Sequence, residues 1–259
     1  MRAARGGYAL PELLVVLGGL VPLVAAALSL VLHATRAAAS ATVLASAEAA
    51  LSDAAQVLEA ELAPLSPGRD LLSLTATGVR FRAARGTGTW CRLDSLGIVV
   101  PSPGAWAASR APQPGRDSIE LELVAPAGSP PRWRWRGALL ADPQPAGCGP
   151  AGGAGLLLPT PLALPPGVVA GPLLRTDEVV ELRAYLSGGR TWLGLDQPAT
   201  GAGIEPLAGP FAAGGIRFEG LRGDGTPAAN PAEVRAVLVR LVTDGPHAVR
   251  RDLVLLLRG

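Results

Sequence analysis

The sequence predicts an α+β protein in which one long N-terminal helix packs on a β-rich head. Residues 8–63 have a helical pattern, which is first apolar and then amphipathic. Residues 64–259 contain short β-like runs separated by Gly and Pro. Gly and Pro number 33 and 25 among the 259 residues but show no repeat period, which predicts a loop-rich folded domain rather than a collagen-like or disordered chain.

The first part of the predicted helix is apolar enough to cross a membrane. The run from Leu13 to Leu32 carries no charge. Its length of about 20 residues, or about 30 Å of helix, matches the hydrocarbon core of a bilayer. Arg2 and Arg5 precede the run, and positive charge on that side stays in the cytoplasm. We therefore expect a single-pass protein of the inner (cytoplasmic) membrane whose head, residues 64–259, is extracytoplasmic.

Glu12 is an acid at the start of this apolar run. A charged residue costs about 2.5–3.5 kcal/mol at the centre of a membrane helix and less near its edge, and the helix dipole favours an anion at the N-terminus. If the chain were cut after Gly7, the new amine of Tyr8 would lie four residues before Glu12, on the same side of the helix. That amine could pair with its own Glu12 or with a neighbour's. The alternative is an accidental acid at the edge of a signal anchor.

Residues 5–17 read Arg-Gly-Gly-Tyr-Ala-Leu-Pro-Glu-Leu-Leu-Val-Val-Leu. This segment resembles the class III signal of type IV pilins and type II secretion pseudopilins. The resemblance implies that prepilin peptidase removes residues 1–7 by cutting after Gly7. It also implies that Tyr8 becomes the N-methylated first residue, and that Glu12 recruits sister subunits and sets their register.

Three residues within the apolar run predict a weak point in the helix: Gly18, Gly19 and Pro22. Pro22 lacks a backbone N–H and pushes against the carbonyl of Gly18, so the helix should kink or loosen there. Subunits of the family that this chain resembles have a helix that can melt locally on assembly, and these residues could serve the same purpose. The alternative is a simple kink, which membrane helices tolerate. Pro11 departs from the family, which more often has Ile or Val, but Pro fits a first helical turn.

The predicted helix turns amphipathic beyond the membrane. Leu44, Leu51 and Leu58 recur every seven residues, and Pro64 ends the pattern. At 1.5 Å per residue, residues 8–63 would extend about 84 Å. We expect the part outside the membrane to form a spine for the head.

The head is predicted to be a sheet of short strands, of a pilin-like kind. The expected strands are 71–75, 78–83, 118–124, 133–140, 178–186, 190–195, 215–221, 234–242 and 248–257. Two Gly- and Pro-rich stretches, 101–115 and 142–172, are expected to be loops. The order of strands, with a Gly-Gly turn at 188–189 and an Asp-Gly turn at 224–225, resembles PilW-like minor pilins and pseudopilin J.

The two cysteines, Cys91 and Cys148, predict one disulfide, because an exported chain with an even count usually pairs them. The bond would be worth about 4 kcal/mol on the chain-entropy account. The alternative is two buried free thiols.

We expect no enzyme, no cofactor and no metal site. The two histidines, His33 and His247, and the two distant cysteines have no metal-binding spacing. Residues 147–152 match G-x-G-x-x-G, but no strand precedes them and Pro150 disfavours a helix start. Asp224 fits a plain turn better than a calcium loop.

Acids on β-like runs are interpreted as solvated strand faces: Asp94, Asp117, Glu120 and Glu122. Residues 132–136 alternate Arg and Trp, which predicts Trp133 and Trp135 in the core and the arginines in solvent. The alternative is an exposed Arg row that touches DNA or an acidic partner.

The resemblance implies a structural minor pilin or pseudopilin in a type IV pilus or type II secretion pseudopilus. Its partners would be prepilin peptidase, sister subunits, the inner-membrane assembly platform and the lipid bilayer. A head of this size favours a position at or near the tip. The alternative is a filament-associated adhesin or DNA-uptake binding protein. Nucleic acid is an unexpected partner, because the formal net charge is only +2.

Overall fold

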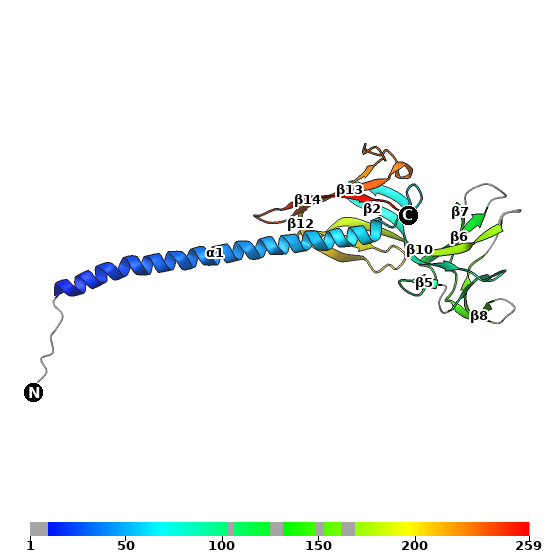
Figure 1. Ribbon diagram of the computed structural model, residues 1–259, viewed down its shortest axis with the longest axis horizontal. Coiled ribbons are helices and arrows are strands. Elements are labelled where there is room, and N and C mark those ends of the chain that lie inside the picture. Colours follow the sequence, from blue (N-terminus) through cyan, green and yellow to red (C-terminus); the bar gives the residue numbers. More distant parts are fainter. Residues whose placement is uncertain (1–9, 103–105, 125–131, 149–152, 162–168, 259) are drawn as a thin grey trace, which may run out of the picture. The chain divides into compact units, whose positions relative to one another are not determined.

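The computed structural model describes residues 10–102, 106–124, 132–148, 153–161 and 169–258. Within these residues there is one long helix, α1 (Leu10–Leu62), and two antiparallel sheets (Figure 1). The predicted α+β class is therefore confirmed. The chain divides into two compact units. Residues 1–49 hold the first part of α1, and residues 50–259 hold its last turns and all the strands.

Helix α1 is continuous from Leu10 to Leu62, close to the predicted bounds. It runs through Gly18, Gly19 and Pro22 without interruption, so the helix is not broken there. The kink or loosening expected at Pro22, and local melting on assembly, stay predictions. The end of α1 is the expected one, because Pro64 lacks the N–H that a further helical turn would need.

The larger sheet has ten strands, and seven of them form its main path. In order across the sheet these are β1 (Leu71–Thr75), β2 (Gly78–Thr89), β10 (Val169–Ser187), β11 (Arg190–Asp196), β12 (Ile204–Leu221), β13 (Ala236–Thr243) and β14 (Arg250–Leu256). Off this path, β5 (Trp106–Ala108) pairs with β2, and β6 (Asp117–Val124) pairs with both β10 and β7 (Arg132–Ala138). A short 3-10 helix, η1 (Pro231–Glu233), precedes β13.

The smaller sheet has four strands. Their order is β3 (Arg92–Asp94), β4 (Gly97–Pro101), β9 (Gly153–Pro159) and β8 (Gln144–Cys148). Strands β5, β8, β9 and the start of β10 lie in the two stretches predicted to be loops, so that prediction was wrong. The run Leu156–Leu158 pairs with β4, while Pro145 lies on the edge strand β8, where a missing N–H is tolerated.

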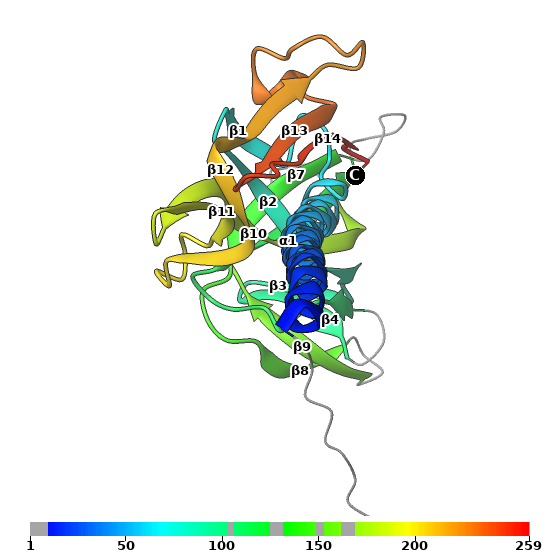
Figure 2. The same cartoon turned by 90° about the vertical axis from the view of Figure 1, so that its left-hand side faces the viewer.

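Strand β10 changes partner along one of its edges and thereby divides the head into two lobes. Residues 181–187 pair with β11, whereas residues 169–178 pair with β6. The helix-side lobe consists of residues 50–62, β1, β11–β14 and the adjoining halves of β2 and β10. The outer lobe consists of β3–β9 and the other halves of those two strands. Figure 2 shows β3, β4, β8 and β9 grouped at one end of the head and β12–β14 at the other.

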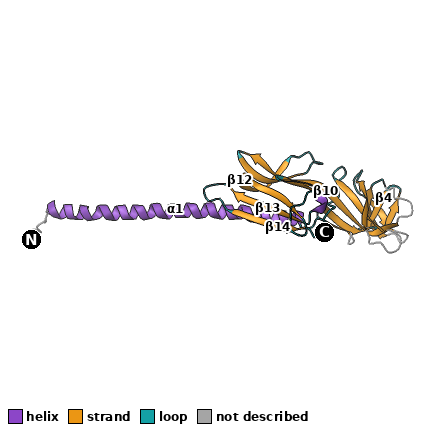
Figure 3. Cartoon of the chain, turned by 90° about the horizontal axis from the view of Figure 1, so that it is seen from above, coloured by secondary structure: helices purple, strands orange, loops and turns teal. Residues whose placement is uncertain are grey.

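The helix-side lobe is built on one face of the last turns of α1. Leu51, Ala54, Leu58 and Leu62 are fully buried, and their spacing of three and four residues places them in one stripe. They pack in a single cluster with apolar side chains of β2, β10, β12 and β13, and Figure 3 shows β12 and β13 beside the end of the helix. Burying each leucine contributes about 1.5–3 kcal/mol. The last turns of the predicted spine are therefore part of the core of the head, whereas Leu44, the first leucine of the predicted repeat, is exposed.

The outer lobe has a hydrophobic core of its own. Its buried members are Ile98, Val100, Ile119, Leu121, Leu123, Trp135, Leu139, Leu158 and Leu174. They come from both sheets, so the four-stranded sheet is packed against the β6–β7–β10 part of the larger one. The prediction that Trp135 faces the core is confirmed, whereas the side chain of Trp133 lies outside the described residues.

Candidate functional site

The first unit presents an apolar surface around the whole circumference of α1. Its large apolar side chains are all about half exposed or more: Leu14, Val15, Val16, Leu17, Leu20, Val21, Leu23, Val24, Leu28, Leu30, Val31 and Leu32. A helix that is apolar on every side requires an apolar environment. Among the described residues α1 is the one helix long and apolar enough to cross a membrane, with a mean hydropathy of 2.6 over its most apolar window.

The predicted processing and assembly residues lie at the beginning of this surface. Glu12 belongs to the first turn of α1 as described, where the N-terminal end of the helix dipole favours an anion. Gly7 and Tyr8 lie outside the described residues. The cut after Gly7, the methylation of Tyr8 and the pairing of Glu12 therefore stay predictions.

Cys91 and Cys148 form a disulfide, as predicted, with their Cα atoms 5.5 Å apart. Cys91 immediately precedes β3, and Cys148 is the last residue of β8. These are the two edge strands of the four-stranded sheet. The bond therefore ties one edge of this sheet to the other within the outer lobe.

The head also contains buried ion pairs that were not predicted. One group, here called the Arg175 cluster, consists of Arg69, Asp70, Glu120, Arg136, Arg175 and Asp177. Arg175 donates to both carboxylate oxygens of Asp70, and its Nε lies 2.7 Å from Glu120 Oε2. Asp70, Glu120 and Arg175 are all buried.

A second group, here called the Glu178 cluster, lies beside the first along β10. It consists of Glu61, Arg85, Arg110, Arg116, Asp117 and Glu178. Glu178 is fully buried and accepts from three arginines, including Arg85 Nε at 3.0 Å and Arg110 at 3.3 Å. Arg110 also donates to both oxygens of Asp117 at 2.6 Å.

A β-bulge aims Arg85 into the Glu178 cluster. The register between β2 and β10 pairs Thr176 with Gly86 and Asp177 with Ala84, which leaves Arg85 as an extra residue. Bulges re-aim side chains in this way. From its position Arg85 bonds Glu178 and also lies 3.4 Å from Glu61, on the last turns of α1. The cluster thus joins the helix to the strand that passes through both lobes.

The acids of the two clusters respond differently to burial. Burial raises the pKa of Asp70, but hydrogen bonds from Arg175 and from the Ser66 N–H outweigh it and hold that pKa below its ordinary value. Burial likewise opposes, without cancelling, the hydrogen bonds that lower the pKa of Glu178. For Asp177 burial prevails over the attraction of Arg136 and Arg175, and its pKa is raised.

The interpretation of Asp117 and Glu120 as solvated was wrong, since both are buried in these clusters. Arg136 is also not a free solvent-facing arginine, because it lies 3.0 Å from Asp177. Glu122 is partly exposed, and the side chain of Asp94 lies outside the described residues. Each cluster balances three acids with three arginines, which neutralises the buried charge.

One local signal for these clusters exists in the sequence. Residues 175–178 read Arg-Thr-Asp-Glu directly after Leu173-Leu174 and directly before Val179-Val180. A charged run that interrupts an apolar strand requires partners if it is buried. The partners themselves come from residues 61–136, so the sequence does not reveal them locally.

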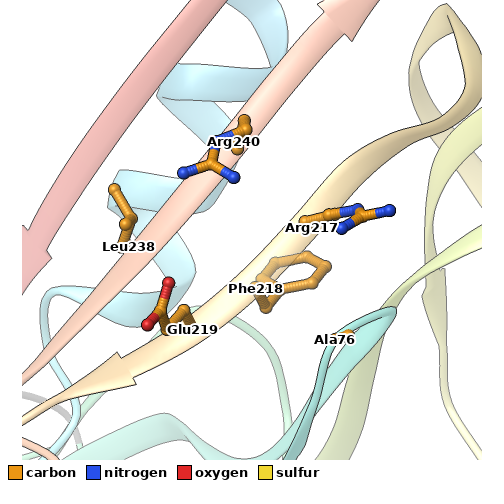
Figure 4. Close-up of a pocket in the computed structure, with 6 residues that line it drawn as sticks. All are labelled: Ala76, Arg217, Phe218, Glu219, Leu238 and Arg240. Carbon is orange, nitrogen blue, oxygen red and sulfur yellow. The ribbon is translucent and has the colours of Figure 1, made fainter. Parts of the chain in front are cut away.

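A pocket of about 280 Å³ lies on the sheet in the helix-side lobe (Figure 4). Arg217 of β12 and Arg240 of β13 are partners in the register of the two strands, and Glu219 also lines the pocket. Figure 4 shows their guanidinium groups pointing away from each other. They therefore do not converge on a common anion.

Among the described residues no three His, Cys, Asp or Glu side chains are grouped as a metal site would require. Asp224 Oδ1 accepts from the Thr226 N–H at 3.0 Å and from its hydroxyl at 2.7 Å, as in a plain turn. In comparisons with known proteins, no family model, no curated protein and no solved structure matched the chain.

Proposed function

We propose that the chain is a minor pilin or pseudopilin, a structural subunit that is anchored in the inner membrane and assembles with sister subunits. The observation that carries the proposal is that the two parts of α1 differ in exposure. Its first part has apolar side chains exposed on every side, and its last turns are buried in the head. A helix of this kind needs an apolar environment for one part and carries a folded domain on the other.

The segment before the exposed surface supports the same proposal. Residues 5–17 carry the pattern of a prepilin-type signal, with Gly7 before the cut, Tyr8 as the mature N-terminus and Glu12 as the acid. In the proposed mature protein, the Tyr8 amine offers Glu12 a charge-assisted partner where water is scarce. Such a pair between subunits fixes their axial register, because the two charges meet at only one stagger.

The head supports a position near the tip. It has two lobes with separate hydrophobic cores, and it is larger than a subunit that must repeat densely requires. We place the head outside the cytoplasm, because Arg2 and Arg5 precede the span and because the outer lobe carries a disulfide. Prepilin peptidase, an inner-membrane assembly platform and sister subunits are the partners of the proposed function.

Mass spectrometry of the N-terminus of the protein purified from its native membrane tests this proposal. The expected peptide begins with N-methylated Tyr8. A chain that still begins at Met1, or one cut in the Ala-rich stretch after Ala25, would contradict the proposed family and leave a tethered or secreted head. The variant Gly7→Leu provides a matched control, because it should block the cut without altering the apolar span.

A further inference from the structure

The hairpin of β10 and β11 carries two aromatic rings side by side on one face. Tyr185 and Trp192 are directly opposite each other in the register of the two strands, and both are half-buried. With Pro206 of β12 they line an open pocket of about 470 Å³. Gly188 and Gly189 close the hairpin in a two-residue turn with positive φ, as predicted, so the turn itself places no side chain over this end of the pocket.

Each ring is seated on backbone that has no side chain. A Cβ at Gly194 would lie 2.6 Å from Tyr185 Cε1, so this ring covers Gly194. A Cβ at Gly209 would lie 3.0 Å from Trp192 Cε3, so that ring covers Gly209. The two glycines allow the rings to approach the backbone of the sheet closely. A flat ring that is held on one side is preorganised to stack on its other side.

The pocket has few polar side chains, and the one charged side chain in its lining is an arginine. Its lining includes Arg190, the Ser187 side chain and the phenol of Tyr185, with no acid. Arg190 is exposed, and no hydrogen bond or ion pair is found for its side chain within the described part of the chain. Apolar walls with a few polar groups are typical of small-ligand sites. The ligand that fits has a flat apolar face, hydroxyl groups and a single negative charge.

We infer that this aromatic pocket binds a pyranose sugar that bears a carboxylate, of the hexuronate type. The C–H face of the sugar ring stacks on Trp192 and Tyr185, and the carboxylate pairs with Arg190. A single arginine is too few for a nucleic-acid backbone, whose binding is dominated by several phosphate contacts. The inference is independent of the proposed assembly role, because it concerns only the surface of the head.

Binding of glucuronate to the full chain in detergent micelles, measured by saturation-transfer NMR, tests the inference. A ligand of this size should bind with a Kd on the order of 1 mM. Arg190→Gln should weaken glucuronate binding about tenfold and leave glucose binding unchanged. Trp192→Ala should abolish the binding of both sugars, whereas Trp192→Phe, which keeps a ring, should retain it.

Leu186→Ala is the matched control, because Leu186 is an exposed neighbour that does not line the pocket. It should bind glucuronate like the wild type. Three outcomes would overturn the inference: no saturable glucuronate binding at ten times the expected Kd, equal competition by acetate, or tighter binding of a thymidine oligonucleotide. Because Arg190 is exposed at the hairpin tip, Arg190→Gln should fold like the wild type. Its effect on glucuronate binding therefore still tests the inference if Trp192→Ala fails to fold.

Discussion

Arg175 bonds both carboxylate oxygens of Asp70, a residue 105 positions earlier in the chain. Asp70 lies on the connection from α1 to β1, directly before β1, and Arg175 lies in the first half of β10. The pair therefore fastens the exit of the helix to the strand that both lobes share. Because both residues are buried, the pair makes the stability of the head sensitive to any change that leaves one charge alone.

Replacing Arg175 should destabilise the head strongly. Arg175→Met removes the charge at similar volume and leaves Asp70 and Glu120 buried without their main partner. Breaking a buried pair in this way costs about 3–5 kcal/mol. Urea unfolding of the full chain in detergent, followed by circular dichroism, should show a lower midpoint. Arg250→Met is the control, because Arg250 pairs with Asp252 in solvent, and an unchanged midpoint is expected for it.

Acid should destabilise the head through Asp70 and Glu178. Both have folded-state pKa values below their ordinary ones, so the stability they contribute is present at neutral pH. That stability is lost as the pH falls below about 4.5, the ordinary pKa of a glutamate, and then through the lowered folded-state values. Asp177 acts in the opposite sense, because its raised pKa makes the folded state bind a proton more readily. Melting temperature against pH measures the balance.

The variant Glu178→Gln separates these contributions. It should melt at a lower temperature than the wild type at pH 7, because three arginines lose their shared acid. It should also lose less stability than the wild type between pH 5 and pH 3. Parallel curves for the two proteins would mean that Glu178 contributes nothing to the acid sensitivity.

Removing the disulfide should loosen the outer lobe first. The double variant Cys91→Ser, Cys148→Ser leaves the edge strands β3 and β8 without their covalent tie, and a loss of about 2–5 kcal/mol is expected. Hydrogen exchange should rise in β3, β8 and β9 while the last turns of α1 stay protected. Uniformly faster exchange over both lobes would show that the two cores unfold as one unit.

Glu12→Gln tests the assembly role of the acid. The change keeps the shape and removes the charge, so membrane insertion and cleavage should continue while co-purification with sister subunits falls. Glu12→Leu should insert at least as well and fail at the same step. Co-purification equal to the wild type for both variants would make Glu12 a passive residue. Val15→Gln, one turn further along the exposed surface, controls for a general effect of polarity.

The elements that the sequence predicts well are those whose signals are local. The stripe of Leu51 and Leu58, the stop at Pro64 and the turn at Gly188-Gly189 all depend on residues a few positions apart. Strand β9 was missed because its apolar run is flanked by Gly and Pro, and only pairing with β4 makes it a strand. Periodicity cannot reveal such a partner.

The charged clusters were missed for a related reason. Asp117 and Glu120 look like polar positions of an exposed strand until Arg110 and Arg175 are placed beside them. Glu178 and Arg85 are 93 residues apart, and the bulge that brings Arg85 into place is set by the register of two long strands. The candidate assembly site depends on a pattern within residues 5–17 alone, and it stays a prediction.

The paired strands β2 and β10 have a mechanical consequence. Their ladder runs from Gly78–Arg183 in the helix-side lobe to Thr89–Leu173 in the outer lobe. A pull that separates the outer lobe from the end of α1 acts along these strands, so the hydrogen bonds of the ladder share the load instead of opening one at a time. Arg85 and Glu178 lie midway along this ladder and resist the same sliding motion. The head should therefore resist tension that is applied along β2 and β10.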